Sequence, residues 1–292
     1  MFSTYVLRAN LRIYDPGAIE TYPAEKIEKR RLNMKSLRVV QITDIHLLAG
    51  PGAKHYGIDT AVTLQKVIDA IIGLTPTPDL MIATGDLAED GLEATYNRLG
   101  KLLAAVNMPV YVLAGNHDDI DKMHDSLVGG NISFVNMARV GNWVFVFVNS
   151  QVVGKSYGLI SPDEMSLLKR NLELARDAPV VVALHHTPME ICPRANCQLQ
   201  NVTEFNQLLG RFPGIKAVIA GHTHVNAEKN NASHVQYTTP STFAQIDHGL
   251  AGDSDSGDFW ALHRMDGSSH GFRVLDLMPG GQASSQVHWV YD

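Results

Sequence analysis

The feature that most constrains the fold is a repeated pattern in which apolar, strand-like runs end in short polar segments. Five such segments occur in this order: Asp44-Ile45-His46, Gly85-Asp86, Gly115-Asn116-His117-Asp118, His185-His186 and Gly221-His222-Thr223-His224. Helix-like segments separate several of the runs. Alternation of strands and helices is typical of parallel sheets with helices outside. Polar clusters at five strand ends indicate a metal-centred hydrolase rather than scattered surface residues.

The expected elements follow from hydrophobic periodicity. Strands are expected over 37–42, 80–83, 110–113, 143–148, 180–184 and 217–220, and helices over 59–73, 91–106, 162–176 and 202–211. The third helix has Ser161 as a plausible cap, Pro162 at its first position and Glu164 three residues past the cap. The later segments 233–239, 258–265, 271–277 and 286–291 are expected to be short strands. They predict a second sheet packed on the first.

Three regions are expected along the chain. Residues 1–37, with the basic cluster Lys26, Lys29, Arg30 and Arg31, form an N-terminal extension. Residues 38–248 form the catalytic domain. Residues 249–292 contribute C-terminal strands that complete the fold and border the substrate site, with a polar loop at 249–258. The sequence shows no internal repeat and no clear linker after residue 37.

Composition excludes some classes of partner. The 292 residues suffice for one large α/β domain, and their net charge of −6 argues against non-specific binding to nucleic acid or anionic membranes. No apolar run approaches the roughly 18 residues of a membrane span. Arg8, Arg12 and Asp15 interrupt the early apolar runs, so no signal-peptide core is expected. A cytoplasmic location follows by elimination.

Only two cysteines occur, Cys192 and Cys197. Two cysteines do not make a disulfide framework or a structural zinc site. We therefore expect two loop thiols. The alternative is a disulfide between them that closes a very short loop.

The polar segments supply ligands for two divalent metal ions. Asp44 and His46 are two residues apart, so on extended backbone both side chains would point the same way and chelate one ion. Asp86 follows a glycine at a strand exit, and we expect its carboxylate to bridge the two ions. Asn116 offers a neutral oxygen. The remaining candidate ligands are nitrogens, from His185, His222 and His224. Such a mixture suits iron, manganese, zinc or cobalt better than magnesium or calcium.

Phosphoryl displacement is the chemistry that such a pair of ions supports, because ions about 3.5–4 Å apart stabilise both the attacking and the leaving oxygen. The leaving alkoxide still needs a proton. His117, adjacent to Asn116 but not needed as a ligand, is the expected donor, and Glu89 or Asp90 would orient it. We expect the phosphate to be bound by His46, Asn116, His117 and His224.

The other histidines have ordinary explanations. His186 is expected to neighbour the metal ligands without binding a metal. The rest read as ordinary polar residues: His55, His124, His234, His248, His263, His270 and His288. His248 is a partial exception, because it follows Thr239-Pro240-Ser241-Thr242 into the expected substrate loop.

With these residues in place, the chain resembles the calcineurin-like metallophosphoesterase superfamily, whose pattern is D-x-H, G-D, G-N-H-[DE], H and G-H-x-H. The resemblance spans roughly residues 38–248 and no motif is missing. It implies an α/β fold, a four-layer αββα sandwich of two mixed β-sheets flanked by helices. It also implies that one metal binds Asp44, His46, Asp86 and His224, and that the other binds Asp86, Asn116, His185 and His222. His117 matches the catalytic histidine of the family.

Within this superfamily the chain looks most like the bacterial class III cyclic-nucleotide phosphodiesterases. The stretches that carry this likeness are 41–47, 83–88, 149–152 and 239–245. The likeness implies hydrolysis of 3′,5′-cyclic AMP, a small-molecule phosphodiester, to 5′-AMP. The extension and the region after Gly249 depart from this group. Glycerophosphodiesters, lipid headgroup diesters or a phosphomonoester are alternative substrates. A third hypothesis is a binding protein of the same fold without turnover. Monomer and homodimer are both open.

Overall fold

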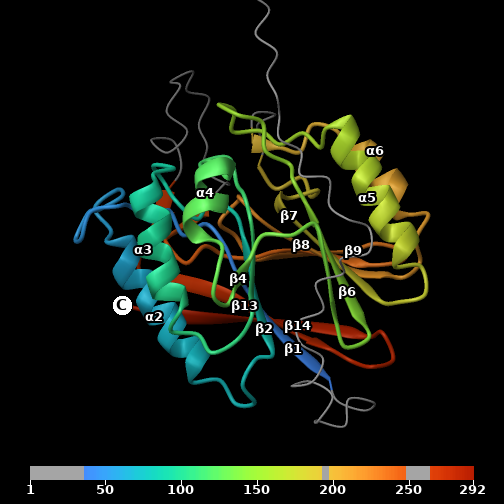
Figure 1. Ribbon diagram of the computed structural model, residues 1–292, viewed down its shortest axis with the longest axis horizontal. Helices are drawn as coiled ribbons and strands as arrows, with labels where there is room; N and C mark the ends of the chain where they lie inside the picture. The colour runs from blue at the N-terminus through green and yellow to red at the C-terminus, as the bar shows by residue number, and fades with distance from the viewer. Residues whose placement is uncertain (1–35, 193–196, 248–263) are drawn as a thin grey trace, which may run out of the picture.

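Two six-stranded sheets face each other in the computed structural model of the protein, which describes residues 36–192, 197–247 and 264–292 (Figure 1). The first sheet has the order β14-β13-β1-β2-β3-β4. Its strands are β1 (Leu37–Ile42), β2 (Leu80–Thr84), β3 (Val110–Leu113), β4 (Ile132–Ser133), β13 (Ser269–Leu277) and β14 (Ala283–Tyr291). Strands β1 to β4 pair in parallel, whereas β13 is antiparallel to both β1 and β14. The C-terminal region therefore completes the first sheet.

The second sheet has the order β5-β6-β7-β8-β10-β9. Its strands are β5 (Met137–Val140), β6 (Trp143–Val148), β7 (Val180–His186), β8 (Ile215–Gly221), β9 (Ala227–Asn230) and β10 (Val235–Thr238). The four central strands are parallel, and the two edge strands are antiparallel to their neighbours. A small third sheet pairs β11 (Gln245–Asp247) with β12 (Arg264–Asp266).

Helices cover the outer faces of both sheets. Helices α2 (Thr60–Ile72), α3 (Glu93–Leu103) and α4 (Ile120–Leu127) pack on the first sheet, and α5 (Pro162–Leu174) and α6 (Val202–Leu209) pack on the second. Figure 1 shows the two helix groups on opposite sides of the sheets. A separate apolar core, which includes Trp143 and Phe145, fills the space between the sheets. Strands covered on both faces read as continuous apolar runs. The expected four-layer αββα sandwich is confirmed.

The helix boundaries follow local capping chemistry. Ser161 accepts a hydrogen bond from Glu164 N at 3.1 Å, as predicted, and Asp59 caps α2 in the same way. Helix α4 was not predicted from the sequence. This helix has only eight residues and buries just Met123 and Leu127, so its periodicity is too short to detect.

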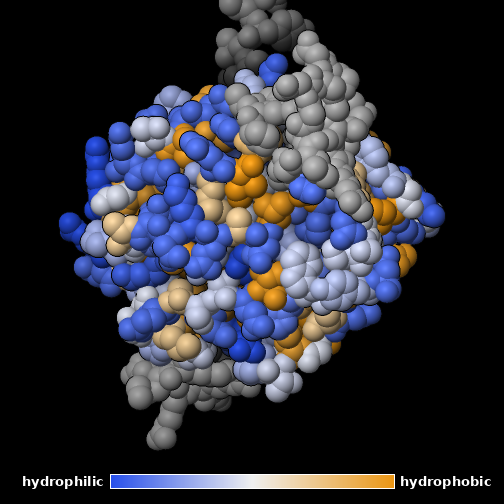
Figure 2. All heavy atoms as spheres, turned by 180° about the vertical axis from the view of Figure 1, so that it is seen from behind, coloured by the Kyte–Doolittle hydropathy of each residue, from blue (hydrophilic) through white to orange (hydrophobic). Residues whose placement is uncertain are grey.

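Several expectations fall on residues that the structure does not describe. Most of the extension (residues 1–35) and the polar loop at 249–258 lie outside the described residues, as does most of the strand expected at 258–265. The strand β1 begins at Leu37, at the end of the expected extension. Within the described ranges, no helix has the length and apolar character needed to cross a bilayer. The face seen in Figure 2 is mostly hydrophilic, with apolar residues in small patches.

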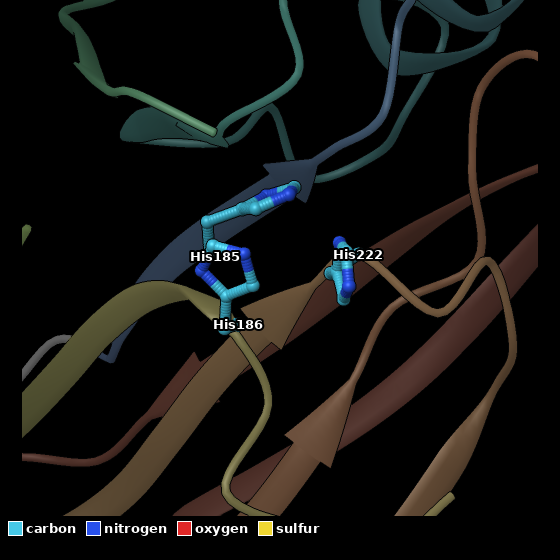
Figure 3. Close-up of side chains that lie close together, drawn as sticks. All are labelled: His185, His186 and His222. Atoms are coloured by element: carbon cyan, nitrogen blue, oxygen red, sulfur yellow. The ribbon is translucent and has the colours of Figure 1, made fainter. Parts of the chain in front are cut away.

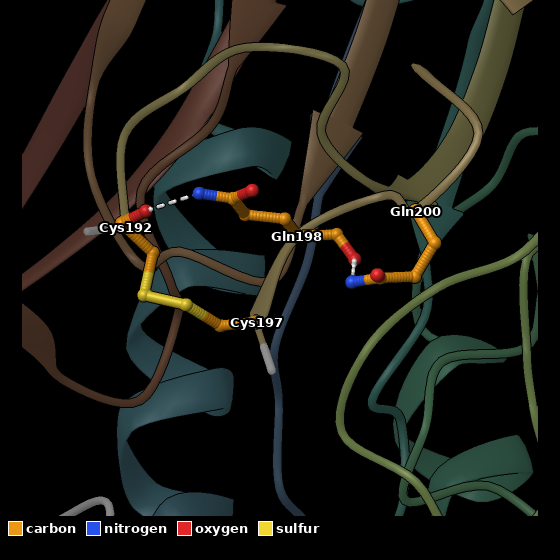
Figure 4. Close-up of a disulfide and its surroundings, with 4 residues drawn as sticks. All are labelled: Cys192, Cys197, Gln198 and Gln200. Atoms are coloured by element: carbon orange, nitrogen blue, oxygen red, sulfur yellow. Dashed lines mark hydrogen bonds between the residues drawn. A yellow bond between two sulfur atoms is a disulfide. The ribbon is translucent and has the colours of Figure 1, made fainter. Parts of the chain in front are cut away.

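The two cysteines form a disulfide, so the expectation of two loop thiols was wrong. Cys192 and Cys197 are five residues apart, and both are buried (Figure 4). Their Cα atoms are 6.3 Å apart, within the range that a disulfide spans. Gln198 Nε2 donates a hydrogen bond to Cys192 O at 3.0 Å and closes the same loop. Sequence spacing alone could not distinguish this bond from two thiols, because pairing depends on the path of the loop.

Candidate metal centre

The five polar segments meet where the carboxyl ends of β1, β2, β3, β7 and β8 come together. Hydrogen bonds join the two sheets at this edge. His185 Nδ1 donates to Thr84 O at 2.8 Å, and His222 N donates to Asp44 Oδ2 at 3.0 Å. All seven predicted ligands and His117 therefore lie around one space, although they come from both sheets.

The backbone around Asp44 and His46 differs from the expectation. The two residues have φ values of 52° and 48°, in the left-handed region rather than extended. Ile45 N and His46 N both donate to Asp86 O, at 2.8 and 3.0 Å, which fixes this tight bend. Their side chains converge because the chain turns sharply, not because of strand alternation. Non-glycine residues rarely take positive φ, and such strain clusters at functional sites.

The same backbone feature recurs at three other candidate ligands. Asp86, His222 and His224 have φ values of 48°, 71° and 53°. Five of the seven predicted ligands are thus held in a conformation that an unconstrained chain avoids. The surrounding hydrogen bonds and burial must stabilise these bends. These hydrogen bonds and this burial define the geometry of the polar edge.

One group of ligand atoms surrounds a position beside β1 and β8. His46 Nε2 lies 3.2 Å from His224 Nε2 and 3.8 Å from Asp86 Oδ2, and His224 Nε2 lies 3.5 Å from Asp44 Oδ1. Metal–ligand bonds of about 2.0–2.2 Å place neighbouring ligand atoms roughly 3–3.5 Å apart. The observed spacings fit a single divalent cation.

A second group adjoins the first through the same carboxylate. His185 Nε2 lies 3.3 Å from Asp86 Oδ2 and 3.2 Å from Asn116 Oδ1. His222, whose ring centroid is 5.0 Å from that of His185, has a buried Nε2 without a hydrogen-bond partner. Figure 3 shows His185, His186 and His222 close together at the ends of β7 and β8. Because Asp86 Oδ2 belongs to both groups, its position is the one a bridging ligand requires.

Three of the histidines are oriented by acceptors behind them. Nδ1–H of His46 donates to Glu89 Oε2 at 2.7 Å, and Nδ1–H of His185 donates to Thr84 O at 2.8 Å. Nδ1–H of His224 donates to Ala244 O at 2.8 Å. Each ring therefore turns the lone pair of Nε2 toward the ligand groups. Metal-binding histidines usually show this arrangement, and the donor set fits two divalent ions.

The electrostatics of the site favour added positive charge. Burial lowers the pKa of His46, and burial lowers the pKa of His222 to about 3, so both rings are neutral as ligands must be. Burial also lowers the pKa of His185, but the Asp86 carboxylate outweighs it and raises that pKa to about 9. The pKa of Asp86 itself is held well below its usual value by His185 and His117, against the effect of burial. The buried Asp86 carboxylate therefore stabilises positive charge on the groups around it.

His117 lies at the edge of this site, and Glu89 is its partner. His117 Nδ1 is 3.2 Å from Glu89 Oε2. Asp90, the other candidate, instead accepts from Thr95 Oγ1 at 2.6 Å and from Leu92 N at 3.2 Å. Burial lowers the pKa of His117, but the carboxylates of Asp86 and Glu89 outweigh burial and raise it to about 10. With Nδ1–H held by Glu89, the proton on Nε2 is the one available for transfer.

Replacing Glu89 with glutamine is expected to weaken metal binding by about 10- to 100-fold, because a neutral amide orients His46 less firmly than a carboxylate. The measurement is competition with a calibrated chelator. Glu173→Gln, at a side chain that is 57% exposed on α5, is the matched control and should bind metal like the parent protein. Equal affinities of Glu89→Gln and the control would contradict the orienting role.

His186 neighbours the ligands as expected. Its Nδ1 accepts from Ser150 Oγ at 2.8 Å, and its ring centroid lies 4.5 Å from that of His222. The ring packs directly on Gly158, where an added Cβ would lie 2.6 Å from His186 Nδ1. The lack of a side chain at Gly158 therefore leaves the space in which the His186 ring packs beside the candidate ligands.

Gly158→Ala is expected to lower the free energy of unfolding by about 1–3 kcal/mol, because His186 is enclosed and cannot move away from the new methyl group. Urea denaturation measures the change. Gly50→Ala is the control, since its Cβ would make only an ordinary contact of 3.5 Å with Ala53. Unfolding midpoints that match between the two variants would show that the packing around His186 is loose.

His55 is the residue that the sequence interpretation missed. Its ring is stacked on that of His46, with centroids 5.5 Å apart and planes 6° apart, and its Nε2 is 3.7 Å from Glu89 Oε2. His55 belongs to none of the five polar segments, so no spacing rule pointed to it. His248, the other histidine considered near the substrate, lies outside the described residues.

Comparison with known proteins agrees with this geometry. Residues 37–226 match the family described as calcineurin-like phosphoesterase. The chain belongs to this family. It is 30% identical to the 3′,5′-cyclic adenosine monophosphate phosphodiesterase CpdA of Pseudomonas aeruginosa, over 88% of this chain and 91% of that protein. It is 31% identical to a 3′,5′-cyclic-nucleotide phosphodiesterase of Nostoc sp., over 87% and 92% of the two chains.

Solved structures show the family fold at low sequence identity. A dimetal phosphatase from Danio rerio superposes with a TM-score of 0.60 and 12% identity, covering 83% of this chain and 93% of that chain. GAP50 from Plasmodium, described as the anchor in the inner membrane complex, gives 0.60 at 14% identity, covering 88% and 85%. At these identities the likeness concerns the fold.

Proposed function

We propose that the protein is a dinuclear metal phosphodiesterase that hydrolyses 3′,5′-cyclic AMP to 5′-AMP. The dinuclear mechanism is supported mainly by the position of Asp86 Oδ2, which lies 3.8 Å from His46 Nε2 and 3.3 Å from His185 Nε2. One carboxylate oxygen thus reaches both ligand groups. The choice of substrate rests on relatives named as cyclic-nucleotide phosphodiesterases that align with most of the chain.

The ligands divide into two sets that share Asp86. One ion would bind Asp44, His46, Asp86 and His224, and the other would bind Asp86, Asn116, His185 and His222. Iron or manganese is the proposed identity, with zinc or cobalt as alternatives. When bound, the two ions supply a water that is readily deprotonated and stabilise the charge on the attacking and leaving oxygens.

The residues of the chain complete the reaction. His46, Asn116, His117 and His224 are proposed to surround the phosphate. The oxygen of water forms a bond to phosphorus, the bond between phosphorus and O3′ breaks, and water loses one proton to solvent. His117 gives its Nε2 proton to O3′ and later recovers one from solvent, so 5′-AMP is released and the enzyme is regenerated. Glu89 holds the opposite nitrogen of His117 and so fixes its direction.

The proposed division of the chain follows the sequence: residues 1–37 form an extension, residues 38–248 form the catalytic domain, and residues 249–292 border the substrate. A cytoplasmic location stays a prediction, and monomer and homodimer are both open. Fractionation of cells and light scattering of the purified protein test them.

Turnover on four esters tests the function. The panel is cyclic AMP, cyclic GMP, a glycerophosphodiester and a phosphomonoester, each with manganese and with iron. We expect the highest kcat/KM for cyclic AMP. If the metal-loaded protein cleaves an artificial aryl phosphodiester but leaves cyclic AMP intact, the proposed substrate is wrong. A glycerophosphodiester or a lipid headgroup diester then becomes the proposed substrate. If it cleaves none of these esters, the non-catalytic reading holds.

A further inference from the structure

A row of aromatic side chains runs from beneath the candidate metal centre to the surface. Phe243 is fully buried, and its ring centroid lies 4.9 Å from that of His55, which lies 4.6 Å from that of Tyr56. The middle ring, His55, is stacked on the candidate ligand His46. The last ring, Tyr56, is 52% exposed. The row thus ends in an aromatic surface open to solvent, two rings away from a candidate metal ligand.

Tyr56 is held in this place by an unusual turn. His55 N donates to Ile58 O and Ile58 N donates to His55 O, both at 2.9 Å. The two central residues, Tyr56 and Gly57, have φ values of 45° and 83°, as type I′ turns require. Asparagine or glycine normally occupies the first of these positions, and positive φ is strained for a bulky side chain. Ile58 anchors the turn, because it packs where a Cβ on Gly267 would stand. A strained, exposed aromatic side chain beside a polar site is the pattern expected of a functional contact.

The site opens on the side of this row. The side chains of His46 and Asp86 are 0% and 3% exposed, whereas those of Glu89 and His117 are 21% and 25% exposed. His117 Nδ1 and His55 Nε2 lie 3.2 and 3.7 Å from the same oxygen, Glu89 Oε2. The aromatic row and the proposed acid therefore border one entrance.

The proposed reaction places the base at this entrance. His117 must reach O3′, which belongs to the ribose that carries the base. The ribose and its base consequently lie on the His117 side of the phosphate. His55 lies on that side, because its Nε2 faces the same Glu89 oxygen as His117 Nδ1, and the exposed ring of Tyr56 adjoins His55.

We propose that Tyr56, supported by His55, is a stacking surface for the purine base of a cyclic nucleotide. This inference rests on the proposed function and names the residues that select its substrate class. Stacking on an aromatic ring is tolerant of base identity, because every base has a π-face. The surface would therefore favour nucleotides over phosphodiesters without a base, and it would discriminate weakly between adenine and guanine.

Two substitutions test the surface. Tyr56→Asn removes the ring and tolerates positive φ, and Tyr56→Phe keeps the ring. We expect Tyr56→Asn to lower kcat/KM for cyclic AMP by about 5- to 100-fold, mainly through KM, while kcat/KM for methyl p-nitrophenyl phosphate, which has no base, changes less than about twofold. Tyr56→Phe should match the parent. Tyr291→Asn, at a tyrosine that is 67% exposed on β14, is the control for loss of a surface ring.

Binding gives a readout that does not depend on turnover. Calorimetry should show that Tyr56→Asn weakens binding of 5′-AMP to the manganese-loaded protein by about 5- to 100-fold, and leaves binding of ribose 5-phosphate unchanged. Equal losses for the ligands with and without a base, or no loss for either, would overturn the stacking surface. Failure of the proposed function looks different, because the parent protein would then cleave the base-free diester but not cyclic AMP. In that case the comparison of 5′-AMP with ribose 5-phosphate still tests whether Tyr56 stacks on a base.

Discussion

Asp86→Asn is expected to release both metal ions and to lower turnover of a phosphodiester by about 10³-fold or more, since metal ions supply several kcal/mol of transition-state stabilisation. Asparagine keeps the shape and one oxygen of the side chain but removes its charge. Asp86 Oδ2 adjoins both ligand groups, so the two sites lose the same ligand together. Loss of one ion alone would indicate two independent sites.

The measurement is elemental analysis of protein dialysed against excess manganese, followed by kinetics on the same samples. Asp125→Asn is the matched control, because Asp125 is 82% exposed on α4 and should keep two ions and full turnover. Asp86 Oδ1 also accepts a hydrogen bond from His117 N at 2.9 Å, which the amide oxygen of asparagine can still accept. Thermal unfolding of the metal-free variant and metal-free parent should show one cooperative transition each, which checks that the variant is folded when its metal content is measured. One ion at full occupancy in Asp86→Asn would contradict the bridging role.

The sequence predicted the layers of the fold because the buried strands are apolar on both faces. Runs such as 143–148 and 180–184 bury nearly every side chain between helices and the other sheet, so they appear as uninterrupted apolar residues. Polar segments at the ends of such runs can only gather at the edge of the sheets. That is why the candidate ligands could be named from their order alone. The structure then brings these residues together, whereas their roles as ligands stay predictions.

What the sequence did not reveal depends on backbone paths between these runs. The chain turns sharply at the left-handed residues Asp44 and His46 because Ile45 N and His46 N donate to Asp86 O. Asp86 lies far along the chain from this turn and contributes no local signal. The approach of His55 to His46 depends on a turn anchored by Ile58 against Gly267. The Cys192–Cys197 disulfide likewise depends on a loop path. Periodicity reports burial, and none of these features changes the burial pattern of a strand or helix.

The role of His117 can be separated from that of the metals by the leaving group. In cyclic AMP the leaving oxygen is a strongly basic alkoxide that needs a proton, whereas nitrophenolate is weakly basic and leaves without one. His117→Ala is therefore expected to lower kcat for cyclic AMP by about 10²–10⁴-fold. For bis(p-nitrophenyl) phosphate the same variant should lose far less. Its metal content should equal that of the parent, since the Nδ1 of His117 faces Glu89 at 3.2 Å and no ligand group requires it.

His124→Ala is the matched control for this experiment, because His124 is 56% exposed on α4, seven residues along the chain from His117. It should behave like the parent with both substrates. Equal losses of His117→Ala on both substrates would point to a role in binding the phosphate rather than in proton transfer. Unchanged turnover of cyclic AMP would remove His117 from the reaction. A loss confined to the alkoxide substrate, with two ions still bound, is the result that only a proton donor explains.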